Sequence, residues 1–299
     1  MSKFSNLTIL KMDNFNKTLQ KLKSLDLSSC SACEAKMLLK QIGEIGKIVH
    51  VIRKGTEFTR IRLNRHGEIF NKIEELSYKP QEFNKTYQRA STPNKTMFYA
   101  SSNQIDGLNA EKNIGLATAL FEGMQPSRDR ESEGEWKVTF SNWVVKEDLQ
   151  LILVWFDNQM LERHPNFEFV YFAFRNFLYK NPLTKDKTIL FYNFLSSHFT
   201  KEKISNETDY LISALFSEIM IEQGFDGITY PSVRTAGKGI NVALIPEVID
   251  SKKVVCNKVF EKKIIKKKKI KEKKSSIDVK IFSKPIFLSE NQTSWEWEY

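Results

Sequence analysis

Apolar residues spaced by three or four predict helices in several parts of the chain. Such spacing runs from about Lys17 to Gly46, where the DLSSC stretch interrupts it with candidate capping residues. It returns at Asn113–Met124. A further helix is expected to begin near Ser205–Asp209 and to end at Gly224, a natural C-terminal stop. The stretch 157–206 is unusually aromatic, and helical packing against a core explains this better than a ligand site does.

Branched and aromatic residues concentrate in six short runs that predict strands. The runs are Glu57–Leu63, Thr96–Ser101, Trp136–Val145, Leu149–Phe156, 225–230 and 240–245. The last two enclose the loop PSVRTAGKG, and a loop between two strands can carry function on a rigid support. Because helices and strands occur without strict βαβ alternation, the sequence predicts an α+β fold.

Length and composition place the chain among ordinary soluble globular proteins. Its 299 residues include 41% hydrophobic and 27% charged residues, enough to bury one large core or a medium domain with appendages. No apolar run approaches the roughly 20 residues that span a bilayer. The N-terminal stretch has no secretory pattern, so a cytoplasmic location is the default expectation.

The positive charge of the chain is concentrated in one segment. Residues 251–274 hold twelve lysines and two glutamates, a balance of +10 that equals the net charge of the whole chain. We expect a solvated, poorly ordered tail, because the segment lacks the interleaved aromatic residues of a base-stacking surface. The alternative is a basic segment that attracts nucleic acid or another anionic partner. The sequence therefore predicts three parts: a helical extension at 1–50, a main domain at 51–250 and a lysine-rich tail at 251–299.

Several common catalytic and binding patterns are absent. The sequence has no GxxxxGK[ST] phosphate-binding loop, no GxGxxG that opens a helix after a strand, and no GxSxG. Three cysteines do not form a disulfide framework, and Cys30 and Cys33 are at best half of a zinc site. No metal is expected.

Four segments carry candidate functional residues. Arg60 lies in EFTRIR, Arg89 stands ten residues before Tyr99 in YQRASTPNKTMFYAS, Glu122 lies in GLATALFEGM, and Ser232 begins the loop after DGITYP. Each has an ordinary structural explanation when taken singly. Glu122 is the most unusual, because a carboxylate on an otherwise apolar helix needs a partner. A salt bridge with an arginine would give the carboxylate that partner, and this explanation is as good as a functional role.

In their order and surroundings these segments resemble the RES domain, a family named for Arg, Glu and Ser. The family is best known from bacterial toxins paired with Xre-type antitoxins. DGITYPSVR, followed by NVAL, is the most specific match, and the resemblance covers roughly Val51 to Asp250. The chain departs from the family's GRFNPPG-like segment, where Gln88 and either Asn94 or Lys95 replace glycines. It also has a longer Tyr99-to-Glu122 spacing and the aromatic insertion at 157–206.

The resemblance implies a fold similar to ADP-ribosyltransferases and an enzyme that cleaves the nicotinamide–ribose bond of NAD+. ADP-ribose would pass to phosphate, to water or to a protein target. Arg60 and Arg89 would hold the pyrophosphate or a neighbouring ribose, and Tyr99 would line the nicotinamide pocket. Glu122 would stabilise the oxocarbenium-like ribose, and Ser232 would position groups by hydrogen bonding. An antitoxin is the implied partner. The competing interpretation is a RES-like module that has lost catalysis and binds nucleic acid through its basic tail.

Overall fold

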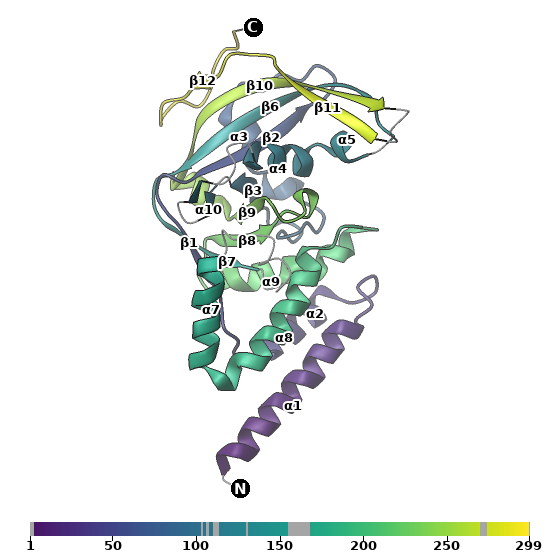
Figure 1. The fold of residues 1–299 in the computed structure, drawn as a ribbon, viewed down its shortest axis with the longest axis vertical. Coiled ribbons are helices and arrows are strands. Elements are labelled where there is room, and N and C mark those ends of the chain that lie inside the picture. Colours follow the sequence, from purple (N-terminus) through teal and green to yellow (C-terminus); the bar gives the residue numbers. More distant parts are fainter. Residues whose placement is uncertain are drawn as a thin grey trace. The chain divides into compact units, whose positions relative to one another are not determined.

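The computed structural model describes residues 3–102, 104–105, 108–109, 114–129, 131–154, 168–269 and 274–298. The chain forms two compact units, and each gathers three separate segments (Figure 1). Unit 1 consists of Met1–His50, Pro80–Met97 and Gln150–Tyr230. Unit 2 consists of Val51–Lys79, Phe98–Leu149 and Pro231–Tyr299. The short strand β1 (Val49–Ile52) carries the chain from the first unit into the second.

Unit 1 is mostly helical. Its helices are α1 (Lys3–Ser24), α2 (Ala32–Gln41), α7 (Glu168–Lys180), α8 (Pro182–Phe199) and α9 (Leu211–Glu222), with the 3-10 helices η1 (Gln81–Phe83) and η3 (Glu207–Tyr210). Strands β7 (Leu149–Leu153) and β8 (Gly227–Pro231) pair in parallel. Ser31 caps α2 by accepting the Glu34 N–H at 3.1 Å, and Gly224, with a φ of +90°, follows α9.

Unit 2 is built on an antiparallel sheet in the order β9-β3-β2-β6-β10-β11. Its strands are β2 (Glu57–Asn64), β3 (Phe98–Ser102), β6 (Gly134–Val145), β9 (Ile240–Leu244), β10 (Val254–Lys269) and β11 (Lys274–Ile281), with β12 (Ile286–Phe287) also paired to β10. A separate pair is formed by β4 (Gln104–Ile105) and β5 (Leu108–Asn109). The short helices are α3 (Ile73–Leu76), α4 (Ile114–Gly123), α5 (Gln125–Arg128), η4 (Val233–Thr235) and α10 (Pro246–Asp250).

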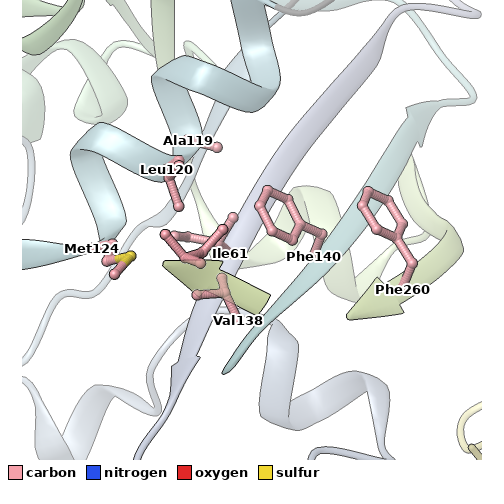
Figure 2. Packing of buried hydrophobic residues seen from close by; sticks show 8 residues of the cluster. Ile61, Ala119, Leu120, Met124, Val138, Phe140 and Phe260 are labelled. Carbon is pink, nitrogen blue, oxygen red and sulfur yellow. The ribbon is translucent and has the colours of Figure 1, made fainter. Parts of the chain in front are cut away.

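Helix α4 packs on one face of this sheet. Figure 2 shows Leu120 and Met124 pointing from the helical segment toward Ile61 and Val138 on neighbouring strands. The helix comes close to β2 because Gly123 has no side chain: a Cβ there would lie 2.6 Å from Cγ1 of Ile61. Together, the apolar stripe of the helix and Gly123 fix the position of the adjacent polar side chain, Glu122.

The predicted α+β class is confirmed, and most predicted elements are found where expected. The strands predicted at Glu57–Leu63 and Trp136–Val145 are β2 and β6, and the 205–224 helix is η3 followed by α9. The first helix begins earlier than expected, at Lys3. Asn113 and the residues 155–167, parts of the predicted helix 113–124, strand 149–156 and insertion 157–206, lie outside the described residues.

The expectation of a poorly ordered tail is wrong over Val254–Lys269, which is the strand β10, paired between β6 and β11. Branched and aromatic residues stand between the lysines, and their side chains are buried on both faces of the strand: Val254, Val255, Val259, Phe260, Ile264 and Ile265. Lys266 is itself 2% exposed and donates to the backbone carbonyls of Pro126 and Asp129. The division into 1–50, 51–250 and 251–299 stays a prediction.

Candidate functional site

The carboxylate of Glu122 is the centre of a polar cluster in unit 2. Its Oε1 accepts hydrogen bonds from Ser232 Oγ at 2.7 Å and from Asn241 Nδ2 at 3.0 Å. Ser101 Oγ donates to Asn241 Oδ1, also at 3.0 Å. We call Glu122, Ser232, Asn241 and Ser101 the carboxylate cluster. Residues that lie 110 and 119 positions apart in the chain are thus brought onto one oxygen atom.

Loop 232–239 holds Ser232 against helix α4. The Ser232 N–H donates to the Gly239 carbonyl at 2.8 Å, and the Gly237 N–H donates to the Ser232 carbonyl at 2.7 Å. Gly237 adopts a φ of +80°, which favours glycine. A Cβ at Gly239 would lie 1.8 Å from Oγ1 of Thr118, so only glycine allows the loop to touch the helix there. Because Thr118 lies one helical turn before Glu122, this contact places the loop beside the carboxylate.

Strand register brings the rest of the cluster to the same place. Residues directly opposite each other in a sheet project from the same face. Thr59 lies opposite Ser101, and Ser101 lies opposite Asn241. Thr59 also shares its face with Ile61, which packs against α4. Ser101 and Asn241 therefore project toward the helix that carries Glu122.

The donors to Glu122 are neutral, so the arginine salt bridge that was one expected explanation of this residue is not found among the described residues. Ser232 is fully buried, Asn241 is 5% exposed and Ser101 is 2% exposed, whereas Glu122 is half-buried. A hydroxyl and an amide satisfy Oε1, and no ion pair of Glu122 is found among the described residues. In that part of the chain no cation pairs with this carboxylate, and its second oxygen has no protein donor.

Arg60 lies in unit 2 but makes different contacts. Its Nε donates to the Leu76 carbonyl at 2.9 Å, and its two terminal nitrogens donate to the carbonyls of Ser77, at 3.0 Å, and of Tyr99. The guanidinium also stands over the Phe98 ring, 5.2 Å from the centroid. Burial lowers the pKa of Arg60 to about 9, and the charge of Arg62 acts in the same direction, so Arg60 stays charged at neutral pH.

Alternation along β2 places Arg60 on the opposite face of the sheet from Thr59 and Ile61. The Arg60 side chain therefore projects from the face that does not carry α4. Tyr99 stands two residues before Ser101 and so projects from the face of the carboxylate cluster, while its carbonyl accepts from Arg60. The backbone of Tyr99 thus links Arg60 to the strand that carries Ser101.

Arg89 belongs to unit 1, unlike the other four predicted residues. It donates to the carbonyls of Phe199 and, at 3.3 Å, of Lys201. Its guanidinium stands over the Tyr210 ring, 5.3 Å from the centroid. These contacts tie the turn after α8 to the segment around Arg89.

Comparison with known families identifies one segment of the chain, which contains part of the carboxylate cluster. Residues 183–261 match the RES domain. The match confirms the RES resemblance, and a RES domain is consistent with an NAD-related function. The curated proteins contain no match to this chain. The RES match begins inside the aromatic stretch 157–206 and runs into β10, the strand that the sequence had assigned to a tail.

The RES match contains Ser232 and Asn241, two of the four members of the carboxylate cluster. Sequence reasoning missed Asn241 and Ser101. A signal for Asn241 is present, since it is the one amide in the apolar strand INVAL and a buried amide needs partners. Ser101 carries no comparable signal, because serine is common in strand ends.

The described part of the chain offers neither a cluster of metal ligands nor a membrane-spanning helix. Within it, no group of three or more His, Cys, Asp and Glu side chains is arranged to hold a metal ion. Likewise, none of the helices described there combines the length and apolarity required to cross a membrane.

Proposed function

We propose that this protein cleaves the nicotinamide–ribose bond of NAD+ and transfers ADP-ribose to phosphate or water. The observation that carries the proposal is the Glu122 carboxylate, held by Ser232 and Asn241 from the RES-matched segment. We further propose that the fold is related to that of ADP-ribosyltransferases.

The geometry suits a reaction in which positive charge develops on a ribose carbon. When the bond from that carbon to the nicotinamide nitrogen breaks, the electron pair leaves with nicotinamide, which becomes neutral. The ribose becomes oxocarbenium-like, and a carboxylate nearby stabilises it. Neutral donors on Oε1 fix the Glu122 carboxylate without cancelling its charge, and Oε2 is available to face the substrate. An oxygen of phosphate or water then forms the new bond to the same carbon.

Ser232 acts in this proposal as a positioning residue. Its hydroxyl is fully buried and donates a hydrogen bond to Glu122. A serine nucleophile instead requires a base that takes its proton and access to the substrate carbon. Ser232 therefore supports Glu122 and is not assigned a covalent role.

The remaining predicted residues are proposed to bind the dinucleotide. The assignment of Arg60 to a phosphate or ribose oxygen stays a prediction, because its guanidinium donates to three backbone carbonyls and projects from the sheet face opposite the carboxylate cluster. The assignment of Arg89 to the pyrophosphate stays a prediction. Tyr99 is proposed to line the nicotinamide pocket from the face that carries the carboxylate cluster.

The test is to incubate the purified full-length chain with NAD+, with and without inorganic phosphate, and to follow nicotinamide release. Free ADP-ribose indicates hydrolysis, ADP-ribose-1″-phosphate indicates phosphorolysis, and ADP-ribose attached to protein indicates transfer to a protein. Glu122→Gln keeps the size of the side chain and removes its charge. Equal release by Glu122→Gln and the unaltered chain would remove Glu122 from the mechanism.

We also propose that the protein acts as a toxin in the bacterial cytoplasm and that an antitoxin protein covers the carboxylate cluster. The support is the RES match together with the NAD+-depleting chemistry proposed above. Induced expression in a bacterial host is expected to lower cellular NAD+ and arrest growth, and Glu122→Gln is expected to do neither. Growth arrest of equal strength by both proteins, with NAD+ unchanged, would contradict the toxin proposal.

A further inference from the structure

The outer edge of β11 is an unpaired strand edge in the part of unit 2 that the structure describes. One side of β11 is fully paired with β10, from Lys262 opposite Ile281 to Lys269 opposite Lys274. The sheet order ends at β11, which Figure 1 shows as the outermost strand beside β10. A strand in this position presents a row of N–H and C=O groups to any chain that lies along it.

The side chains of this edge include exposed apolar residues. Ile277, Val279 and Ile281 alternate along β11 and therefore project from one face. Ile277 packs against the core beneath α4, while Val279 is 47% and Ile281 81% exposed. The charged residues Asp278 and Lys280 alternate with the apolar ones and project from the other face, so they do not cover Val279 and Ile281.

We propose that β11 pairs antiparallel with β11 of a second copy of this chain, centred on Val279. A two-fold axis through Val279 places Ile277 opposite Ile281 of the other copy, so the apolar side chains of both copies meet on one face. On the other face it places Asp278 opposite Lys280, twice by symmetry. The strand is therefore complementary to itself in both apolar character and charge.

Other two-fold registers satisfy these side chains less well. Centring on Asp278 or Lys280 places like charges directly opposite each other, and centring on Ile277 places Lys274 opposite Lys280. Centring on Ser276 pairs Lys274 with Asp278 but leaves the two exposed apolar residues outside the pairing. The register centred on Val279 is the one that joins both kinds of contact.

The charges on β11 itself argue for a second copy over the other possible occupants. Lysines on β10 favour an acidic partner in general, but Asp278 lies in the middle of the edge and would repel an acidic strand. In the self-pairing, Lys280 of the other copy compensates that carboxylate. A nucleic acid would gain nothing from the exposed Val279 and Ile281, since it is drawn to the lysines alone.

The experiment measures the dimer dissociation constant of the full chain by analytical ultracentrifugation. Asp278→Lys and Lys280→Asp each convert two attractive pairs into repulsive ones, and each is expected to weaken the dimer about tenfold. A mixture of the two variants is expected to form a heterodimer of restored affinity, because every facing pair then has opposite charges. Lys267→Asp, a similar charge change on the neighbouring strand β10, is the matched control and is expected to leave the dimer intact.

Three results would overturn the proposal. The first is an unaltered chain that stays monomeric up to about 100 μM, well above ordinary dimer affinities. The second is a Lys280→Asp variant that dimerises as well as the unaltered chain. The third is a mixture of variants no tighter than either variant alone. If the unaltered chain binds an oligonucleotide without dimerising, and Lys267→Asp loses that binding as fully as Lys280→Asp does, the segment is a nucleic-acid surface instead.

Discussion

Glu122 and Glu218 are glutamates on helices of the two units, and their surroundings differ in kind. Glu218, on α9 of unit 1, accepts from Lys36 Nζ and Lys95 Nζ, each at 2.7 Å, and from Thr92 Oγ1 at 2.9 Å. Both of its oxygens are occupied, and two of its three donors are cations. Glu122, on α4 of unit 2, accepts from two neutral groups on a single oxygen.

The difference shows what each carboxylate can do. Burial alone would raise the pKa of Glu218, but the hydrogen bonds from Lys36, Lys95 and Thr92 outweigh it and lower the pKa to about 2. A carboxylate so fully compensated has no capacity left for a substrate and serves to join α2, the 92–95 turn and α9. Glu122 is equally well oriented but still has its charge and one oxygen to offer. Orientation without neutralisation is the condition that electrostatic catalysis requires.

The largest expected effect is on catalysis at Glu122. Glu122→Gln removes the charge but keeps an oxygen for Ser232 and Asn241, so nicotinamide release is expected to fall about 10³-fold. The free energy of unfolding should change by less than about 1 kcal/mol, because no ion pair is lost. Steady-state turnover and urea denaturation of the same preparation measure both. Glu218→Gln is the matched control, and a similar loss of turnover in both variants would erase the distinction.

The reverse result is expected at Glu218. Glu218→Gln removes the carboxylate shared by Lys36 and Lys95, whose side chains are 22% and 60% exposed, while Lys36 keeps its pair with Glu222. The change should cost about 1 kcal/mol of stability, and turnover per folded molecule should be retained. Since the pKa of Glu218 is lowered in the fold from 4.5 to about 2, its contribution is full above 4.5 and is lost as the pH falls toward 2. Hydrogen exchange of α2 and α9 at pH 7 and at pH 3 localises the effect. An unchanged acid dependence in Glu218→Gln would contradict this account.

A steric change tests whether the Glu122 site depends on the loop contact. In Gly239→Ala the new Cβ would fall 1.8 Å from Thr118 Oγ1 and 2.7 Å from Thr118 Cβ, so rotating the threonine cannot relieve the clash. Loop 232–239 must move away from α4, and Ser232 moves with it. We expect a loss of about 2 kcal/mol in stability and a clear fall in turnover. Gly43→Ala, in unit 1 where nothing lies within 4 Å, is the control for a glycine change by itself; its φ of +76° predicts a small stability loss with turnover unchanged.

The sequence predicted local structure better than it predicted partnerships. The strands around Arg60 and the helix around Glu122 followed from periodicity, because each pattern is complete within about ten residues. The pairing of Glu122 with Ser232 and Asn241 did not, because it depends on strand register and on two glycines that allow close approach. An arginine was one expected partner for Glu122, and the actual partners are a hydroxyl and an amide. The lysine-rich segment was misjudged because its charge obscured the apolar positions that bury β10.

The smallest expected effect concerns Asn241, which shares Oε1 of Glu122 with Ser232. Asn241→Ala removes one neutral donor at 3.0 Å and leaves the other in place, so the carboxylate loses orientation but keeps its charge. We expect kcat to fall about tenfold, equivalent to about 1.4 kcal/mol, with KM nearly unchanged, because the lost contact acts on the transition state through Glu122. Ser101→Ala, one hydrogen bond further away, should have a smaller effect of the same kind. If KM rises while kcat is retained, Asn241 contacts the substrate directly. If Asn241→Ala instead loses as much activity as Glu122→Gln, the amide is needed for more than orientation, and the neutral donors would then be as important to the site as the carboxylate they hold.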